Sequence, residues 1–312
     1  MCTRIVAAYM IAVITLMSCS STEVQYDAVP EEICFKRIDD IMSKADLSDT
    51  HSSMGVFAYM SGTSSLYFSD SAFTPSEGSN TWVGGKYWPL NPQTSLDFIM
   101  YAPHTSHVDD SQNLSIYYNR SNNILTMKIP YRTVEKGGQI DWLYGEQVYS
   151  GTSATYGEQS LPVKMKHAMA KVSIEVKADI EELYQYESVQ IMGTPQAGTF
   201  TIDYNKTPVT CTPSNGGGGY NHYFSEHLKG TYLTKEEINV GSILVFPIKY
   251  SSLKLNVKYK MSSTNDIVYT ETIDLYAEPT QWECGKHYIY TIALSSNKIS
   301  ITPTVDDFNT GN

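Results

Sequence analysis

The sequence predicts an all-β protein built from two antiparallel β-sandwiches in series. Short strand-like segments recur along the chain, separated by turns with Gly and Pro and without α/β alternation. The 312 residues amount to about two domains of average size. Charged residues make up 18% of the chain, below the usual ~25%, and 24 Tyr take part of their place. Aromatic side chains fit pleated, half-buried surfaces, and the 41% hydrophobic share is enough for a core.

The individual strands follow from the spacing of apolar residues. Residues 55–59 and 96–101 are apolar on both faces, which is typical of central strands. Residues 172–176 and 253–259 alternate apolar with polar, which predicts strands with one wet face. Helical pattern is scarce.

Shorter segments complete the pattern. Residues 33–35 alternate, and so do residues 125–129 before Pro130 ends them. Residues 179–187 and 233–238 could each hold a helical turn or two.

Turn-rich sequence sets the expected domain limits. We expect a signal peptide over residues 1–19, a tether over 20–30, one sandwich over 31–163 and a second over 164–312. The sandwich boundary follows the turn-rich stretch before residue 160 and precedes the regular strand that starts near residue 171.

The first residues indicate export. One Arg precedes the apolar run of residues 5–17, which is too short to span a bilayer but suits a signal peptide. Leu16, Ser18 and Cys19 close the run and resemble the bacterial lipobox, in which the cysteine receives acyl chains. The sequence therefore predicts a lipid anchor at Cys19 that attaches an otherwise soluble protein to a membrane. The alternatives are a plain signal peptide with an incidental cysteine and a buried N-terminal strand.

Charge and hydropathy exclude other classes of protein. The net charge is −11 and no Lys/Arg run exceeds two residues, which argues against a nucleic-acid partner. After the first twenty residues, no apolar stretch is long enough to cross a bilayer as a helix.

The remaining cysteines form no recognisable motif. Once the signal peptide and Cys19 are set aside, Cys34, Cys211 and Cys284 remain, and their spacings match no zinc or redox site. Buried free thiols are one interpretation, and a Cys211–Cys284 disulfide is the other.

No catalytic, metal or cofactor site emerges. The glycines at 216–219 are not followed by the Lys-Ser/Thr of a phosphate-binding loop. His104 and His107 lie near Asp109 and Asp110, but their spacing needs a helix to ligate a metal and Pro103 favours a loop. No nucleophile motif appears, so we expect neither an enzyme nor a cofactor.

Two tryptophans raise a question of carbohydrate binding. Trp82 and Trp88 could stack on sugars if their faces were exposed. The alternative is that both are core or sheet-edge residues, as large aromatic residues usually are.

Four groups of motifs, in this order along the chain, resemble one family. Taken together they are similar to the fimbrillin family of Bacteroidales, which includes type V pilins and related surface lipoproteins. The motifs are Glu-Ile-Cys-Phe-Lys-Arg-Ile (32–38) with Ser-Lys-Ala (43–45) and Met-Gly-Val-Phe-Ala-Tyr (54–59); Lys-Tyr-Trp-Pro (86–89) with Leu-Asp-Phe-Ile-Met-Tyr-Ala-Pro (96–103); Lys-His-Ala-Met-Ala-Lys (166–171); and Trp-Glu-Cys-Gly-Lys-His-Tyr-Ile-Tyr (282–290).

The resemblance implies a fold and a way of assembly. It implies two transthyretin-like β-sandwich domains, lipoprotein export to the outer membrane, and a role as a fimbrial subunit that supports adhesion. It also implies that a trypsin-like protease removes the first strand, for which Arg37 and Lys44 are the candidate sites. The partners would be other fimbrial subunits in a head-to-tail polymer, the membrane through the lipid anchor, and host or bacterial surface glycans or proteins as ligands.

The last strand is the candidate donor for such a polymer. Ile299, Ile301 and Val305 alternate with polar residues, and Phe308 follows. Such a strand could fill a groove in a neighbour by β-strand addition, and a head-to-tail contact of this kind gives filaments. The alternative is that it is simply the last strand of its own domain.

Two other functions remain open from the sequence. One is a monomeric outer-membrane lipoprotein that binds carbohydrate, and the other is an enzyme that acts on glycans. Retention of the first strand and an affinity for glycans that depends on Trp82 or Trp88 would indicate the binding protein.

Overall fold

The structure is a computed structural model of the chain. It describes residues 30–36, 53–79, 81–107, 114–130, 139–206, 209–214, 219–224, 228–249, 253–262, 266–275, 281–296 and 298–308. Contacts divide the chain into two compact units, Met1–Pro30 and Glu31–Asn312, and every described residue except Pro30 belongs to the second.

The described residues are predominantly in strands, which confirms the all-β prediction. They include the short helix α2 (Ser153–Tyr156) and the 3-10 turn η1 (Thr105–His107). Within the described ranges, no helix has both the length and the apolar character to cross a membrane.

The first sheet has nine strands. Its order is β10-β1-β4-β3-β2-β5-β8-β11, and β9 pairs with β5. All seven residues of β5 are buried, as expected for a central strand that is apolar on both faces. The strands are β1 (Glu32–Lys36), β2 (Met54–Met60), β3 (Leu66–Pro75), β4 (Thr81–Tyr87), β5 (Leu96–Ala102), β8 (Leu143–Gly145), β9 (Tyr149–Gly151), β10 (Leu161–Pro162) and β11 (Met165–His167).

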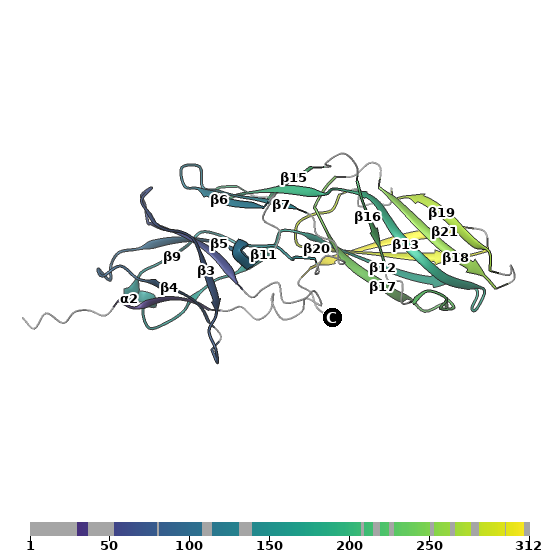
Figure 1. Cartoon of the computed structure of the whole chain (residues 1–312), viewed down its shortest axis with the longest axis horizontal. Helices are drawn as coiled ribbons and strands as arrows, with labels where there is room; N and C mark the ends of the chain where they lie inside the picture. Colours follow the sequence, from purple (N-terminus) through teal and green to yellow (C-terminus); the bar gives the residue numbers. More distant parts are fainter. Residues whose placement is uncertain are drawn as a thin grey trace, which may run out of the picture. The chain divides into compact units, whose positions relative to one another are not determined.

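The second sheet joins strands from both halves of the chain. Its order is β15-β14-β7-β6, from β6 (Ser115–Asn119), β7 (Ile124–Pro130), β14 (Ala197–Asp203) and β15 (Thr210–Ser214). Strand β14 pairs with β7 along seven residues, and Figure 1 shows β6, β7 and the later strand β15 in the same part of the fold. Sheets therefore contain strands from both sides of residue 163, where the sequence predicts the boundary between the two sandwiches.

One core lies where the first two sheets pack together. Phe57 and Ile99 of the first sheet share this core with Met127 and Phe200 of the second. The opposite face of the first sheet buries a separate core that includes Phe98. The hairpin of β14 and β15 thus covers apolar surface that the earlier strands present.

The last two sheets share a third core. The order in one is β17-β12-β20-β21 and in the other β16-β13-β18-β19. Residues of both sheets contribute to the same cluster of buried side chains. The strands are β12 (Ala170–Ala178), β13 (Tyr184–Thr194), β16 (Tyr220–Tyr223), β17 (Ile238–Val245), β18 (Lys254–Met261), β19 (Val268–Asp274), β20 (Lys286–Leu294) and β21 (Ile299–Asp307).

Two details differ from the sequence-based expectations. Strand pairs β12–β20 and β1–β10 are parallel, although antiparallel sheets were expected throughout. The helical turn expected within residues 179–187 is wrong, because residues 179–183 form bends and turns and β13 begins at Tyr184. Tyr184 and Tyr186 both reach the third core, so burial of two aromatic side chains outweighs the weak helical pattern. Residues 233–238 likewise form no helix.

Candidate assembly strands at the two ends of the chain

The first strand, β1, lies between two others within its sheet. It pairs antiparallel with β4 along Glu32–Lys36 and parallel with β10 at Phe35 and Lys36. The Trp88 amide donates to the Glu31 carbonyl at 2.8 Å, and the Gly85 amide donates to the Glu32 carboxylate at 2.9 Å. Both edges of this short strand are therefore engaged.

Two side chains of β1 reach the interior. Ile33 and Phe35 have no exposed surface. The Phe35 ring meets Phe73 and Phe98 edge to face, with centroids 5.1 Å and 5.2 Å away. Alternation explains this arrangement, because residues two apart on a strand share one face. Burying both side chains contributes about 3–6 kcal/mol in total.

Some predicted sites fall outside the described residues. Cys19 lies in the first unit, and Arg37 and Lys44 lie in the segment 37–52 that follows β1. The lipid anchor and the cleavage sites remain predictions.

The candidate donor strand, β21, occupies the edge of its own sheet. It pairs antiparallel with β20 along nine residues. Ile299 and Ile301 are partly buried against the third core, whereas Val305 is 42% exposed. In this chain β21 is thus the last strand of its own sheet, and donation to a neighbour would require it to leave β20.

Phe308 fixes the end of this strand. Its ring stacks on the His167 ring with centroids 4.0 Å apart. The Lys171 ammonium lies over the Phe308 ring, 5.8 Å from its centroid, in a cation–π contact. His167 Nδ1 lies 2.7 Å from a carboxylate oxygen of Asp141, and both side chains are buried. The Phe308 amide donates to the Gly285 carbonyl at 2.8 Å. The role of Asp141 was missed, because nothing in the sequence links it to residues so far away.

The two tryptophans correct the carbohydrate hypothesis. Trp82 is 1% exposed and Trp88 is 2% exposed, and both belong to the core of the first sheet. The Trp88 ring contacts Phe98 edge to face at 5.6 Å. Because both rings are covered, neither offers a face to a sugar in this structure, and the core interpretation is the one that the packing supports.

Of the candidate metal residues, His104 is engaged within the protein. His104 is 8% exposed, and its ring bonds the Ser106 hydroxyl at 2.6 Å and the Asp70 carbonyl at 3.2 Å. Hydrogen bonding to Asp70 raises the pKa of His104 against the lowering effect of burial. Among the described residues, no group of three acidic, His or Cys side chains could hold a metal. Asp109 and Asp110 lie outside the described residues.

The three remaining cysteines are free thiols. Burial raises the pKa of Cys211 and of Cys284 to about 12 in each case. Such thiols are largely protonated at neutral pH and react slowly. Cys211 and Cys284 are partly buried against the core between the first two sheets, which fits the interpretation as small hydrophobic residues.

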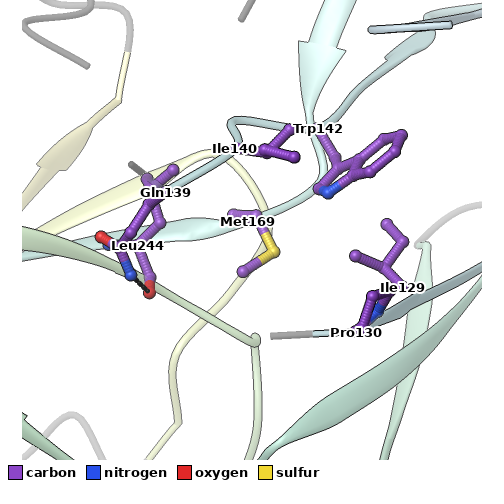
Figure 2. A pocket seen from close by; sticks show the side chains of 7 residues that line it. All are labelled: Ile129, Pro130, Gln139, Ile140, Trp142, Met169 and Leu244. Atoms are coloured by element: carbon purple, nitrogen blue, oxygen red, sulfur yellow. Dashed lines mark hydrogen bonds between the residues drawn. The ribbon is translucent and has the colours of Figure 1, made fainter. Parts of the chain in front are cut away.

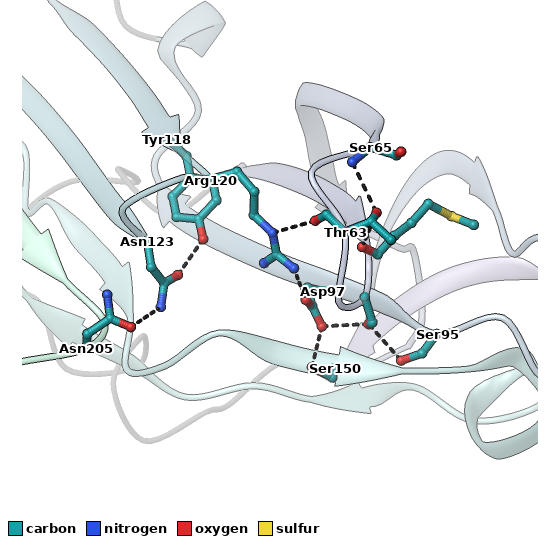
Figure 3. Close-up of polar contacts among 11 residues, drawn as sticks. Thr63, Ser65, Ser95, Asp97, Tyr118, Arg120, Asn123, Ser150 and Asn205 are labelled. Atoms are coloured by element: carbon teal, nitrogen blue, oxygen red, sulfur yellow. Dashed lines mark hydrogen bonds and ion pairs between the residues drawn. The ribbon is translucent and has the colours of Figure 1, made fainter.

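A polar cluster connects β5, β9 and the turn after β2 in the first sheet with the β6–β7 turn of the second (Figure 3). The Asp97 carboxylate accepts hydrogen bonds from Ser61 and Ser150, each at 2.6 Å, and pairs with the Arg120 guanidinium at 2.5 Å. Arg120 also donates to the Thr63 carbonyl at 3.0 Å. Every one of these groups bonds to another protein group, so the cluster fastens the β6–β7 turn to the first sheet.

A small pocket lies between the end of β7, the residues that precede β8 and β12, and β17 (Figure 2). The Gln139 side chain donates to the Leu244 carbonyl at 2.9 Å and accepts from the Leu244 amide at 2.6 Å. Its polar side chain is thereby satisfied, and the apolar lining offers no convergent set of polar groups for a ligand. The lining residues are Ile129, Pro130, Gln139, Ile140, Trp142, Met169 and Leu244.

Comparison with known families identifies the fold. A family model described as fimbrillin-like matches residues 44–307. The chain belongs to the fimbrillin-like family. This match confirms the resemblance in the sequence motifs. No curated protein matches this fimbrillin-like chain.

Several solved structures are similar to the fimbrillin-like chain. A candidate cell adhesion protein from Bacteroides uniformis has a TM-score of 0.59 at 14% identity, covering 91% of this chain and 100% of its own. A fimbrial protein from Bacteroides vulgatus has a TM-score of 0.57 at 14% identity, with coverages of 89% and 99%. A candidate cell adhesion protein from Bacteroides ovatus has a TM-score of 0.53 at 14% identity, with coverages of 91% and 100%. At this identity the likeness shows a shared fold.

Proposed function

We propose that the fimbrillin-like chain is a structural subunit of a cell-surface fimbria that supports adhesion. It is exported as a lipoprotein, anchored in the outer membrane through acyl chains on Cys19, and assembled by β-strand exchange. Residues 1–19 act as the signal peptide and lipobox, and residues 20–30 as the tether to two transthyretin-like sandwiches. Membership of the fimbrillin-like family supports the fimbrial role.

The observation that carries the proposal is the position of β1. Its two buried side chains fill the core of the first sheet, and a segment with Arg37 and Lys44 follows it directly. Cleavage in that segment would leave β1 held by non-covalent contacts alone. Its loss would open an edge of β4 and uncover the sites of Ile33 and Phe35, a state that sheets normally avoid.

The other end of the chain supplies the donor. Strand β21 is at a sheet edge and pairs there with β20, so it can leave without opening the centre of a sheet. Ile299 and Ile301 would leave one apolar environment and enter another in the next subunit. The apolar burial and backbone hydrogen bonds that β21 loses on leaving β20 would be replaced by similar contacts in the next subunit, which makes exchange feasible.

The alternative, a monomeric carbohydrate-binding lipoprotein, loses its main support with the burial of Trp82 and Trp88. A catalytic role has no positive support from the family, which is fimbrial and structural.

N-terminal sequencing of protein extracted from the cell surface tests the proposal. We expect the mature subunit to begin after Arg37 or Lys44 and to run as a ladder of high-mass forms on gels without heating. The unprocessed form should enter the detergent phase, and a Cys19→Ala variant should not. A surface protein that keeps β1 and stays monomeric would contradict the proposal.

A pair of variants tests the donor strand. Val305 is exposed, so Val305→Asp should leave the monomer folded but weaken polymer formation. Thr304→Asp places the same charge at an exposed neighbour on the opposite face and serves as the control. Ile301→Asp should abolish polymers as well, but it also loosens the third core, so its folding needs a separate check by circular dichroism. If both single variants, Val305→Asp and Ile301→Asp, still form normal polymers, β21 is excluded as the donor.

A further inference from the structure

We infer that the groove left by β1 selects a donor strand with an aromatic residue, and that this donor comes from a different subunit, not from a second copy of this chain. The inference rests on the proposed function, since it concerns the strand that replaces β1. Its basis is the shape of the two sites that β1 fills, compared with the side chains that β21 offers.

The site of Phe35 is built for an aromatic ring. Phe73 and Phe98 approach this ring edge to face, at interplanar angles of 68° and 85°. Edge-to-face pairs gain energy beyond their buried area, which a branched aliphatic side chain does not recover. A smaller side chain there would also leave a void in a core whose residues are fully buried.

The site of Ile33 lies two residues along the same face. A donor therefore needs an apolar residue and an aromatic residue in an i, i+2 relation. At the preceding position, Glu32 accepts a hydrogen bond from the Gly85 amide. The complete pattern is a hydrogen-bond acceptor, an apolar residue, any residue, and an aromatic residue.

The last strand of this chain does not carry that pattern. When Ile299 takes the place of Ile33, Ile301 takes the place of Phe35 and Lys298, which has no acceptor, takes the place of Glu32. Moving the strand by two residues puts Pro303 at the aromatic site, where its missing N–H also weakens pairing.

Other registers fare no better. The next shift puts Pro303 at the apolar site and Val305 at the aromatic site. Phe308 shares a face with Asp306, so the register that places the ring in the aromatic site puts a carboxylate into the apolar one. Reversing the strand direction exchanges the members of these pairs, and the reversed register that places Phe308 at the aromatic site puts Thr310 at the apolar one.

The position of Phe308 in the chain supports the same conclusion. Its ring is already engaged by His167 and Lys171 at the end of β21. The subunit would then donate β21 to one kind of neighbour and accept a strand with an aromatic residue from another. In the resulting fimbria, the subunit that fills the groove of this chain is a different protein.

Peptide exchange on the full mature chain tests the inference. A site-specific protease sequence placed after Lys44 allows cleavage that leaves β1 bound. Labelled peptides are then added in excess, and native mass spectrometry measures which of them replaces the β1 fragment. The peptides are residues 30–37 as a positive control, residues 298–308, and residues 298–308 with Ile301→Phe or Ile299→Phe, one for each strand direction.

We expect the 30–37 peptide and one of the phenylalanine variants to replace β1, and the unchanged 298–308 peptide to bind at least tenfold more weakly. Phe98→Leu in the cleaved chain that receives the peptide should reduce the difference in binding between the unchanged and the phenylalanine peptide, because it removes one of the edge-to-face partners. Equal binding of the unchanged and phenylalanine peptides would overturn the selectivity and favour a homopolymer. If even the 30–37 peptide fails to exchange, strand exchange itself is wrong, and this inference falls with it.

Discussion

The ring of Phe308 stacks on the ring of His167, with centroids 4.0 Å apart and an angle of 21° between the planes. Phe308 directly follows the last strand, and His167 ends β11, the last strand of the first sheet's path. His167 is in turn paired with the buried Asp141. The end of the candidate donor strand is thus fastened to a segment that belongs to another sheet.

This contact predicts that Phe308→Ala loosens β21. Loss of the stacking and cation–π contacts should lower the free energy of unfolding by about 1–2 kcal/mol. Hydrogen exchange of the β21 amides, measured by mass spectrometry, should accelerate more than exchange in β13. Thr304→Ala, at an exposed position of the same strand, is the matched control and should leave the exchange rates unchanged. Unaltered exchange in Phe308→Ala would show that pairing with β20 alone holds the strand.

A second prediction concerns Phe35. Phe35→Ala removes a fully buried ring from between Phe73 and Phe98, so the free energy of unfolding should fall by about 3–5 kcal/mol. Lys36→Ala, at the exposed next position, should cost less than about 0.5 kcal/mol. Urea denaturation of the two variants measures the difference. After cleavage behind β1, the Phe35→Ala strand should also dissociate faster than the wild-type strand, and an equal rate would argue against the ring as its anchor.

The Asp97 cluster predicts a pH-dependent contribution to stability. Burial raises the pKa of Asp97, but hydrogen bonds from Ser150 and Ser61 and the contact with Arg120 outweigh it and hold the pKa below its usual range. The ionised form is therefore favoured in the folded state, and the associated stability is present at neutral pH and lost as the pH falls below about 4.

Asp97→Asn tests this relation. At pH 7 the variant should be less stable than wild type by about 1.5–3 kcal/mol, the range for hydrogen bonds to a charged group. Thermal or urea unfolding between pH 7 and pH 2.5 should show the two proteins converging in acid as the wild-type carboxylate is protonated. A constant difference across that range would mean that the charge of Asp97 does not contribute.

Gly55 allows a test of close packing between β2 and β5. A Cβ atom placed on Gly55 would overlap the ring of Tyr101, whose hydroxyl donates to Asp70 at 2.6 Å. Gly55→Ala should therefore cost about 1–3 kcal/mol, because the buried ring must shift. In a Tyr101→Ala background the same change should cost less, since the obstructing ring is gone. Equal costs in the two backgrounds, measured by urea denaturation, would contradict this account.

Local patterns in the sequence determined the strands of this protein. Alternation at residues 172–176 and the doubly apolar runs at 55–59 and 96–101 sufficed to place β12, β2 and β5, because a side-chain period of two and burial on both faces are properties of a single strand. The motifs along the chain likewise sufficed to indicate the fimbrillin-like family.

Tertiary structure decided which strands meet and which side chains are covered. Pairing of β7 with β14, the parallel pairing of β12 with β20, and the meeting of Asp141, His167 and Phe308 join residues far apart in the chain. Trp82 and Trp88 are buried because other strands pack against them. The residues around each tryptophan in the sequence do not show which strands those are. Strand patterns are local, whereas pairing and burial depend on the balance of all contacts in the folded chain, and that balance is set only when the sheets come together.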